Sequence, residues 1–190
     1  MAKILEFSSK RADQAHFERL LRPHLEQLYR LAYRFTGNAA DAEDLIQDLL
    51  IKIYPRREEL KKVEKLRPWL VRVLYNLFID NQRRHNRSPV HLAVDNQPDG
   101  EGGSPLELVT ASEATNPESV TLRHDHLNHL QAALDELSED HRMVVTLHDI
   151  EGYTLEEMTE IVGCPIGTLK SRLHRARARL RELLYGEDMF

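Results

Sequence analysis

A change of composition at Ser88 constrains this chain more than any other feature of its sequence. The stretch from Ser88 to Ser119 holds four of the eight prolines and three of the eight glycines, but no aromatic residue. Such a composition is typical of a linker. On both sides of it, apolar residues recur at the period of amphipathic helices, without the sustained alternation that strands show. The sequence therefore predicts an all-α chain of two small helical domains, at 1–87 and 119–190, joined by a flexible acidic linker at 88–118.

Size and apolar content limit the classes to which the chain can belong. With 190 residues, 41% of them hydrophobic, each half can bury only a modest core. No run approaches the roughly 18 apolar residues of a membrane span, and the N-terminus lacks the apolar run of a signal peptide. The single cysteine, Cys164, excludes an internal disulfide and a cysteine-based zinc cluster. We therefore expect a cytoplasmic protein without membrane insertion.

Charge is unevenly distributed along the chain. The net charge of −5 argues by itself against nucleic-acid binding. However, residues 1–87 carry +6, residues 88–120 carry −6 and residues 121–190 carry −5. Residues 165–181 hold cations and no acid. This pattern indicates a basic helix on an acidic support.

Periodicity and capping residues predict where the helices lie. We expect Asn38 and Ser138 to be N-caps, and Thr154 with Glu157 to form a capping box. Pro68 suits the first position of a helix. The predicted helices run over 17–35, 38–54 and 68–84, and then over 122–137, 138–151, 154–162 and 166–184.

The run YTLEEMTEIVGCPIGTLKSRLHRARARLRELL has the form of a helix-turn-helix, with a turn at Gly163. On a helical wheel the last helix has one apolar stripe, which we expect to face the core. Its opposite side combines small residues with side chains that can donate to base edges, flanked by cations that suit phosphates. A solvated basic helix without a ligand is the alternative. The stripe consists of Ile166, Leu169, Leu173, Ala176 and Leu180.

The segment WLVRVLYNLFIDNQRR is apolar nearly all round. Its core side is expected to centre on Leu70, Leu74 and Leu77. An aromatic, an amide and arginines on the far side suit the binding of unpaired bases. Trp69 is explained equally well as a core residue between helices. The far side carries Trp69 at its edge, Arg72, Asn76, Ile79 and Arg83, followed by Arg84.

The segment ADAEDLIQDLLIKIY buries one apolar arc and leaves Asp44, Gln47, Asp48 and Ile51 exposed together. An exposed isoleucine among carboxylates indicates a docking face for a basic protein surface. The alternative is a solvated acidic face with one isolated apolar residue.

Catalytic patterns are absent from the sequence. It contains no glycine-rich phosphate loop, no GxSxG and no HExxH, so we expect neither enzymatic activity nor a cofactor. His124 and His126 would point to opposite sides of a helix, so we interpret them, with His129, as surface histidines and expect no metal site; whether this group binds anything stays open.

These blocks together resemble the extracytoplasmic-function (ECF) sigma factors, the minimal two-domain specificity subunits of bacterial RNA polymerase. The resemblance covers roughly residues 17–87 and 117–185. It rests on TGNAADAEDLIQDLLIKIY, WLVRVLYNLFIDNQRR, NPES and LDELSEDHRMVVTLHDIEGYTLEEMTEIVGCPIGTLKSRLHRARARL, in this order. It implies sigma domain 2 at 1–87 and a helix-turn-helix sigma domain 4 at 119–190.

The resemblance also implies partners and site residues. The partners are core polymerase, through the coiled coil of its largest subunit and its flap, promoter DNA, and an anti-sigma factor that could hold the protein at the inner membrane. The helix from Trp69 and the loop before it would open the −10 element and hold its non-template strand. By the resemblance, the residues that bind core polymerase are Asp41, Asp44, Gln47, Asp48 and Ile51. Those that bind the −10 element are Trp69, Arg72, Asn76, Arg83 and Arg84. Those that bind the −35 element are Thr168, Lys170, Ser171, Arg172, His174, Arg175 and Arg177.

One alternative function comes from a different class. A stand-alone helix-turn-helix regulator would use residues 119–190 for DNA and residues 1–87 for a ligand or a dimer interface. It would bind a symmetric operator tightly without polymerase. A sigma factor with net charge −5 should instead bind DNA poorly when free, because phosphate contacts supply most of non-specific affinity.

Overall fold

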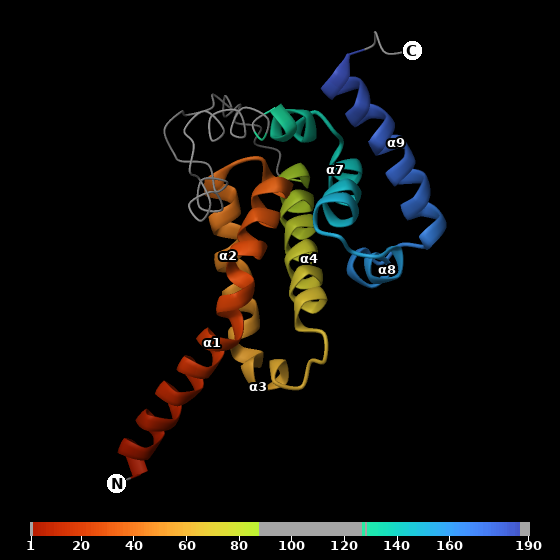
Figure 1. The fold of residues 1–190 in the computed structure, drawn as a ribbon. Helices are drawn as coiled ribbons and strands as arrows, with labels where there is room; N and C mark the ends of the chain where they lie inside the picture. The colour runs from red at the N-terminus through yellow and green to blue at the C-terminus, as the bar shows by residue number, and fades with distance from the viewer. Residues whose placement is uncertain (1, 88–126, 128, 187–190) are drawn as a thin grey trace, which may run out of the picture.

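The computed structural model describes residues 2–87, 127 and 129–186, and within these residues every regular element is helical (Figure 1). The linker predicted at 88–118 and the start of the second predicted domain lie outside the described residues. We call residues 2–87 the N-terminal unit and residues 129–186 the C-terminal unit. The all-α prediction is confirmed.

The N-terminal unit begins with a long helix, α1 (Ala2–Thr36), followed by α2 (Ala39–Ile53). The helix predicted from residue 17 thus starts much earlier, because residues 2–16 contain no breaker although their apolar periodicity is weak. Gly37 ends α1 with a φ of 79°, which glycine adopts without steric cost. Asn38 caps α2 as predicted, since its side-chain oxygen accepts a hydrogen bond from the backbone N–H of Asp41 at 2.8 Å.

Two short turns lead from α2 to the second long helix of this unit. They are η1 (Tyr54–Arg56) and α3 (Arg57–Leu60), which occupy the charged stretch between the predicted helices. The helix α4 (Leu66–Arg87) then starts slightly before the predicted Pro68. Proline fits there because the first turn of a helix has no intrahelical partner for its backbone N–H groups.

The C-terminal unit contains α7 (Glu139–Val145), η2 (Thr146–Ile150), α8 (Leu155–Val162) and α9 (Ile166–Tyr185), preceded by helical residues 129–135. The capping box predicted at Thr154 and Glu157 is present. Ser138 lies at the N-cap of α7, but its side chain makes no capping hydrogen bond. The helix predicted over 138–151 changes at Thr146 into a π-helical turn, η2.

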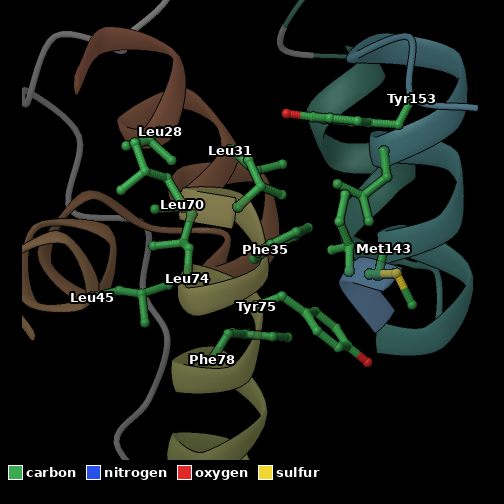
Figure 2. Close-up of a cluster of buried hydrophobic side chains, with 14 of the residues drawn as sticks. Leu28, Leu31, Phe35, Leu45, Leu70, Leu74, Tyr75, Phe78, Met143 and Tyr153 are labelled. Carbon is green, nitrogen blue, oxygen red and sulfur yellow. The ribbon is translucent and has the colours of Figure 1, made fainter. Parts of the chain in front are cut away.

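One hydrophobic core runs through both units. In the N-terminal unit α2 buries Leu45 and Leu49 against α1 and α4, and in the C-terminal unit α9 buries Leu169 and Leu173. The two cores join where α8 packs on α4 and α7 packs on α1. Figure 2 shows the ring of Tyr75 extending from α4 toward Met143 of the other unit. The units that the sequence separates by a linker therefore form one closed body, which is the arrangement we call the closed form.

Candidate partner and nucleic-acid interfaces

The acidic face expected on α2 is exposed. Asp44, Gln47 and Asp48 all lie on the surface, and 71% of Ile51 is accessible. These side chains share one side of the helix because the opposite arc is anchored in the core. Asp41 is exposed too, but its backbone and carboxylate both bind Asn38 in the cap. The carboxylate of Asp48 accepts a hydrogen bond from the side-chain amide of Asn81 at 3.4 Å. The face thus combines exposed carboxylates with one large apolar side chain.

An apolar groove of about 600 Å³ lies beside this face, between α1 and the end of α2. Ile51 lines the groove, and among the described side chains Glu18 and Arg22 are the only charged ones in the lining. An apolar side chain of a partner could therefore be buried there while charged groups pair on the face outside. The apolar lining consists of Phe17, Leu21, Leu25, Leu50, Ile51, Tyr54 and Pro55.

The candidate unpaired-base face on α4 is solvent-accessible. Arg72, Asn76, Arg83 and Arg84 are exposed, as the wheel predicts. Trp69 lies at the edge of this face, where it is half-buried and packs against the hydrophobic core.

Two side chains near this face depart from the prediction. Ile79, expected on the far side, is half-buried and packs on the core. Tyr75, which the wheel leaves unassigned, is 7% exposed. Burial and the nearby carboxylate of Asp140 raise the pKa of Tyr75. The helix therefore has a second buried flank, which faces the C-terminal unit.

The helix-turn-helix is formed as predicted. Gly163 ends α8 in the left-handed region with a φ of 74°, and Pro165 occupies the N-cap position of α9. Four residues of the predicted stripe face the core: Leu169, Leu173 and Ala176 are buried in it and Leu180 packs against it. Ile166, also expected there, is half-buried and does not pack on the core. Of the candidate base-reading residues, Lys170, His174 and Arg175 are exposed, whereas Thr168 and Ser171 are half-buried. The hydroxyl of Ser171 donates to the carbonyl of Thr168 at 2.9 Å.

Two of the candidate DNA-binding arginines on α9 are already paired with acids of their own unit. Arg172 lies 2.7 Å from the carboxylate of Asp140. Arg177 donates two hydrogen bonds to Asp149, at 2.9 and 2.5 Å. These bonds hold the pKa of Asp149 below its usual range and raise that of Arg177. The acidic support of the basic helix thus neutralises part of its charge.

The strongest polar contact between the units centres on Glu151. Its side chain is only 7% exposed, although Asp149 and Gly152 near it in the chain are exposed. Arg34 of α1 donates to one carboxylate oxygen at 2.9 Å, and Gln27 donates to the other at 2.5 Å. Arg67 of α4 donates to the backbone carbonyl of Glu151 at 3.0 Å and lies over the ring of Tyr153, 5.0 Å from its centroid. Burial lowers the pKa of Arg34, while the Glu151 carboxylate opposes that shift.

A second polar contact is made by Arg142 of α7. Its guanidinium donates to the backbone carbonyls of Leu134 at 2.9 Å and Asp135 at 2.8 Å within its own unit. It also donates to the carbonyl of Phe35, at 3.2 Å, across the interface. The planar fork of arginine matches three carbonyls in a way that a lysine cannot. Arg142 therefore fastens the end of α1 to the C-terminal unit.

The interface also contains an unsatisfied polar group. The hydroxyl of Tyr153 is buried and finds no acceptor among the described residues. Burial raises the pKa of Tyr153 to about 12, while the guanidinium of Arg67 beside it opposes the shift. Separation of the units would expose this hydroxyl to water, which can accept its hydrogen bond.

These interface residues were not found from the sequence. Glu151 lies 117 positions from Arg34 and 124 from Gln27, and no local pattern connects groups so far apart. The sequence feature that best indicates a contact between the units is the second apolar flank of α4, at Val71 and Tyr75. One small core needs only one apolar flank of a helix, so a second flank indicates a second packing partner.

The residues that the structure describes offer neither a cluster of metal ligands nor a membrane-spanning helix. No group of three histidine, cysteine or acidic side chains is placed there to hold a metal ion; His124 and His126 lie outside those ranges, and His129 is exposed. Among the described helices, none has both the length and the apolar content needed to cross a membrane.

Family comparisons match both units. Residues 20–88 match Sigma-70 region 2, and residues 127–180 match Sigma-70, region 4. Over 188 residues the chain is 35% identical to the ECF RNA polymerase sigma factor SigE of Mycolicibacterium smegmatis, covering 95% of this chain but 66% of the relative. It is 30% identical over 175 residues to the ECF RNA polymerase sigma factor SigW of Bacillus subtilis, covering 92% of each.

Solved structures with the same fold include two sigma-factor complexes. The sigma factor RpoE, in complex with the anti-sigma factor NepR from Bartonella quintana, aligns with a TM-score of 0.64 and 29% identity over 90% of this chain and 98% of that one. CnrH, in complex with the cytosolic domain of CnrY, aligns with a TM-score of 0.59 and 22% identity over 92% of this chain and 91% of that one, which supports the fold alone.

Proposed function

Because the chain belongs to the ECF RNA polymerase sigma factors, we propose that its exposed faces divide the work of promoter recognition. The face on α2 binds core polymerase, the exposed side of α4 takes the −10 element, and that of α9 takes the −35 element. The observation that carries this proposal is that three faces of different chemistry, predicted separately, each present exposed polar or charged side chains on helices whose opposite sides are buried in the core. The domain boundaries at 1–87, 88–118 and 119–190 are part of the proposal.

Core binding follows from the chemistry of α2. Asp44 and Asp48 offer carboxylates to a basic partner, and Ile51 with the groove beside it offers an apolar anchor. Charged groups at the rim favour fast association and correct orientation, and a desolvated apolar contact supplies affinity. A helical coiled coil with basic and apolar side chains, such as that of the largest polymerase subunit, fits both features.

The closed form cannot read both promoter elements at once. The α8 helix packs on both α4 and α9, so the two reading helices lie about two helix–helix distances apart, roughly 20 Å. Elements centred near −35 and −10 are about 25 base pairs apart, which is about 85 Å of duplex. The roughly 40 residues between α4 and the C-terminal unit can reach about 130 Å when extended. Promoter binding therefore requires that the two units separate, and the chain between them is long enough.

We also propose that the protein performs no chemistry of its own. Strand opening would be driven by the capture of unpaired bases on α4, at about 1–3 kcal/mol for each stacked base. An anti-sigma partner is proposed by analogy with RpoE bound to NepR. Such a partner would act on the exposed faces or on the closed form.

Transcription in vitro tests the assignment. Purified protein and core polymerase are given a promoter library, and run-off products are sequenced. We expect products only when the chain is present, from promoters that share two elements. A symmetric operator bound tightly without polymerase would instead support the stand-alone regulator.

Variants separate the two roles. Replacing Asp44 and Asp48 by Lys should abolish association with core polymerase, measured by pull-down, because it reverses the charge of the docking face. Arg175→Ala should leave core association intact and weaken dependence on the −35 element. Arg56→Gln, at an exposed pair that belongs neither to the three faces nor to the lining of the groove, is the control. Equal loss of core binding in the Arg175 variant would contradict the division of labour.

A further inference from the structure

In the closed form Glu151 of the C-terminal unit occupies an anion-binding site on the N-terminal unit. The two carboxylate oxygens of Glu151 accept from different partners, Arg34 at 2.9 Å and Gln27 at 2.5 Å, and Arg67 lies 3.7 Å from the oxygen that Gln27 binds. The side chain of Arg34 is only 17% exposed. Two guanidinium groups and an amide therefore converge on one carboxylate from α1 and the start of α4.

This site keeps its positive charge when the C-terminal unit leaves. Within the described ranges, Glu151 is the only acid that forms a salt bridge with Arg34 or with Arg67. Arg30, one turn before Arg34, adds positive potential that lowers the pKa of Arg34 further. Separation of the units would leave these arginines without a counter-charge, so the vacated site would attract another anion.

The position of the site indicates which anion. Arg67 stands two residues before Trp69 on the helix that carries the −10 face. A phosphodiester offers two oxygens, as a carboxylate does, and the planar fork of arginine binds either group. Nucleic acid held on α4 would bring a phosphate within reach of this end of the helix.

We propose, building on the proposed function, that Arg34, Gln27 and Arg67 form a phosphate site for the non-template strand near the −10 element, and that Glu151 occupies it in the closed form. Glu151 thus stands in for a DNA phosphate. When the two units separate, a phosphate of the promoter strand replaces the carboxylate of Glu151 in the site. The exchange couples release of the C-terminal unit to capture of the strand.

The first test measures binding of a single-stranded DNA oligonucleotide to the full chain by fluorescence anisotropy. The oligonucleotide carries the −10 element selected in the transcription experiment. Glu151→Gln keeps the shape of the side chain but removes its charge, and should raise affinity about tenfold because the site is no longer blocked. Glu59→Gln, which also removes one exposed acid but breaks a pair with Arg56 outside this site, is the matched control and should leave affinity nearly unchanged.

The second test removes one arginine of the site in the Glu151→Gln variant, in which the site is not blocked. Arg67→Gln, added to Glu151→Gln, should lower affinity roughly tenfold and reduce the slope of log K against log salt by about 0.7, the value for one phosphate contact on a single strand. Arg67 is 45% exposed, so its replacement is safer for folding than that of Arg34. Arg56→Gln in the same background is the control for loss of a cation. An unchanged affinity and slope in the Arg67 variant would overturn the proposal.

A third test locates the phosphate. Neutral methylphosphonate groups are placed one at a time along the strand. One position should weaken binding to Glu151→Gln but have no further effect once Arg67 is also replaced. If no position behaves in this way, or if a poly-glutamate peptide occupies the site while DNA does not, the ligand is a protein carboxylate and the proposal is wrong. Failure of the proposed function itself would show differently, as no promoter-dependent transcript from the unmodified chain.

Discussion

The two helices proposed to read DNA are held in place in different ways. The α4 helix is buried on two flanks, one against α1 and α2 and the other against the C-terminal unit. The α9 helix is held by one narrow stripe. Its cations are partly paired with acids, as Arg172 is with Asp140 and Arg177 with Asp149, whereas the arginines on the exposed face of α4 form no salt bridge within the described ranges. Packing on two flanks thus positions α4, whereas acidic partners neutralise part of the positive charge of α9.

The largest effect is expected from the first flank of α4. Leu74 is completely buried, so Leu74→Ala should lower the free energy of unfolding by about 3 kcal/mol, through lost burial and the cavity left behind. Urea unfolding followed by circular dichroism measures this change. Arg72→Ala on the exposed side of the same helix should change stability by less than about 0.5 kcal/mol. Similar losses in both variants would mean that α4 is not positioned by packing.

The second flank should show a smaller and different effect. Tyr75→Ala removes a ring that is buried where the units meet, and should destabilise the closed form by about 2 kcal/mol, below the usual core value because the units can separate. Calorimetry should then resolve two transitions in place of one. Tyr75→Phe, which keeps the ring, should retain a single transition; splitting in both variants would show that packing of the ring does not join the units.

Charge on α9 should respond to removal of its acidic partner. Asp149→Asn frees Arg177 and removes a negative charge near the DNA-reading side. We expect duplex DNA carrying the −35 element to bind a few-fold more tightly, because exposed pairs are worth at most about 1 kcal/mol. Anisotropy titrations at low salt measure the change. Arg177→Gln, added to Asp149→Asn, should remove this gain in affinity. Weaker binding of the Asp149 variant would contradict the inference that Asp149 neutralises part of the charge of α9.

The smallest effect is the dependence of this pair on pH. The pKa of Asp149 in the native protein lies below its usual range, chiefly because of the hydrogen bonds from Arg177. Its contribution to stability is therefore present above the ordinary aspartate pKa of about 4, and is lost as the pH falls through the lowered value. The difference in unfolding free energy between wild type and Asp149→Asn should be below about 1 kcal/mol near neutral pH. A difference that grows toward acid pH would contradict this sign.

Much of each unit could be predicted from local patterns. The buried arc of α2, the stripe of α9 and the capping box at Thr154 all follow from residues within one or two helical turns. The early start of α1 was missed because helix propensity without a strong apolar face leaves little periodicity to detect.

The closed form could not be predicted from the same patterns. Its contacts join Arg34, Gln27 and Arg67 of one unit to Glu151 of the other, across the linker. Each of these residues has an ordinary local context for a surface side chain. An apolar wheel such as that of α4 shows that a helix has two buried flanks, but not what covers the second one.

The wide turn η2 makes the number of residues between α7 and Glu151 important for the structure. There the backbone N–H of Glu151 bonds to the carbonyl of Thr146, five positions back, so the turn holds one residue more than a regular helix. Deleting a single residue between 148 and 150 would restore ordinary helical winding, but it would rotate everything downstream by about 100° and carry Glu151 away from Arg34. Because α9 packs on α7, the same rotation would also force the C-terminal core to repack. The extra residue of η2 is therefore needed twice, once for the C-terminal core and once for the contact that closes the two units.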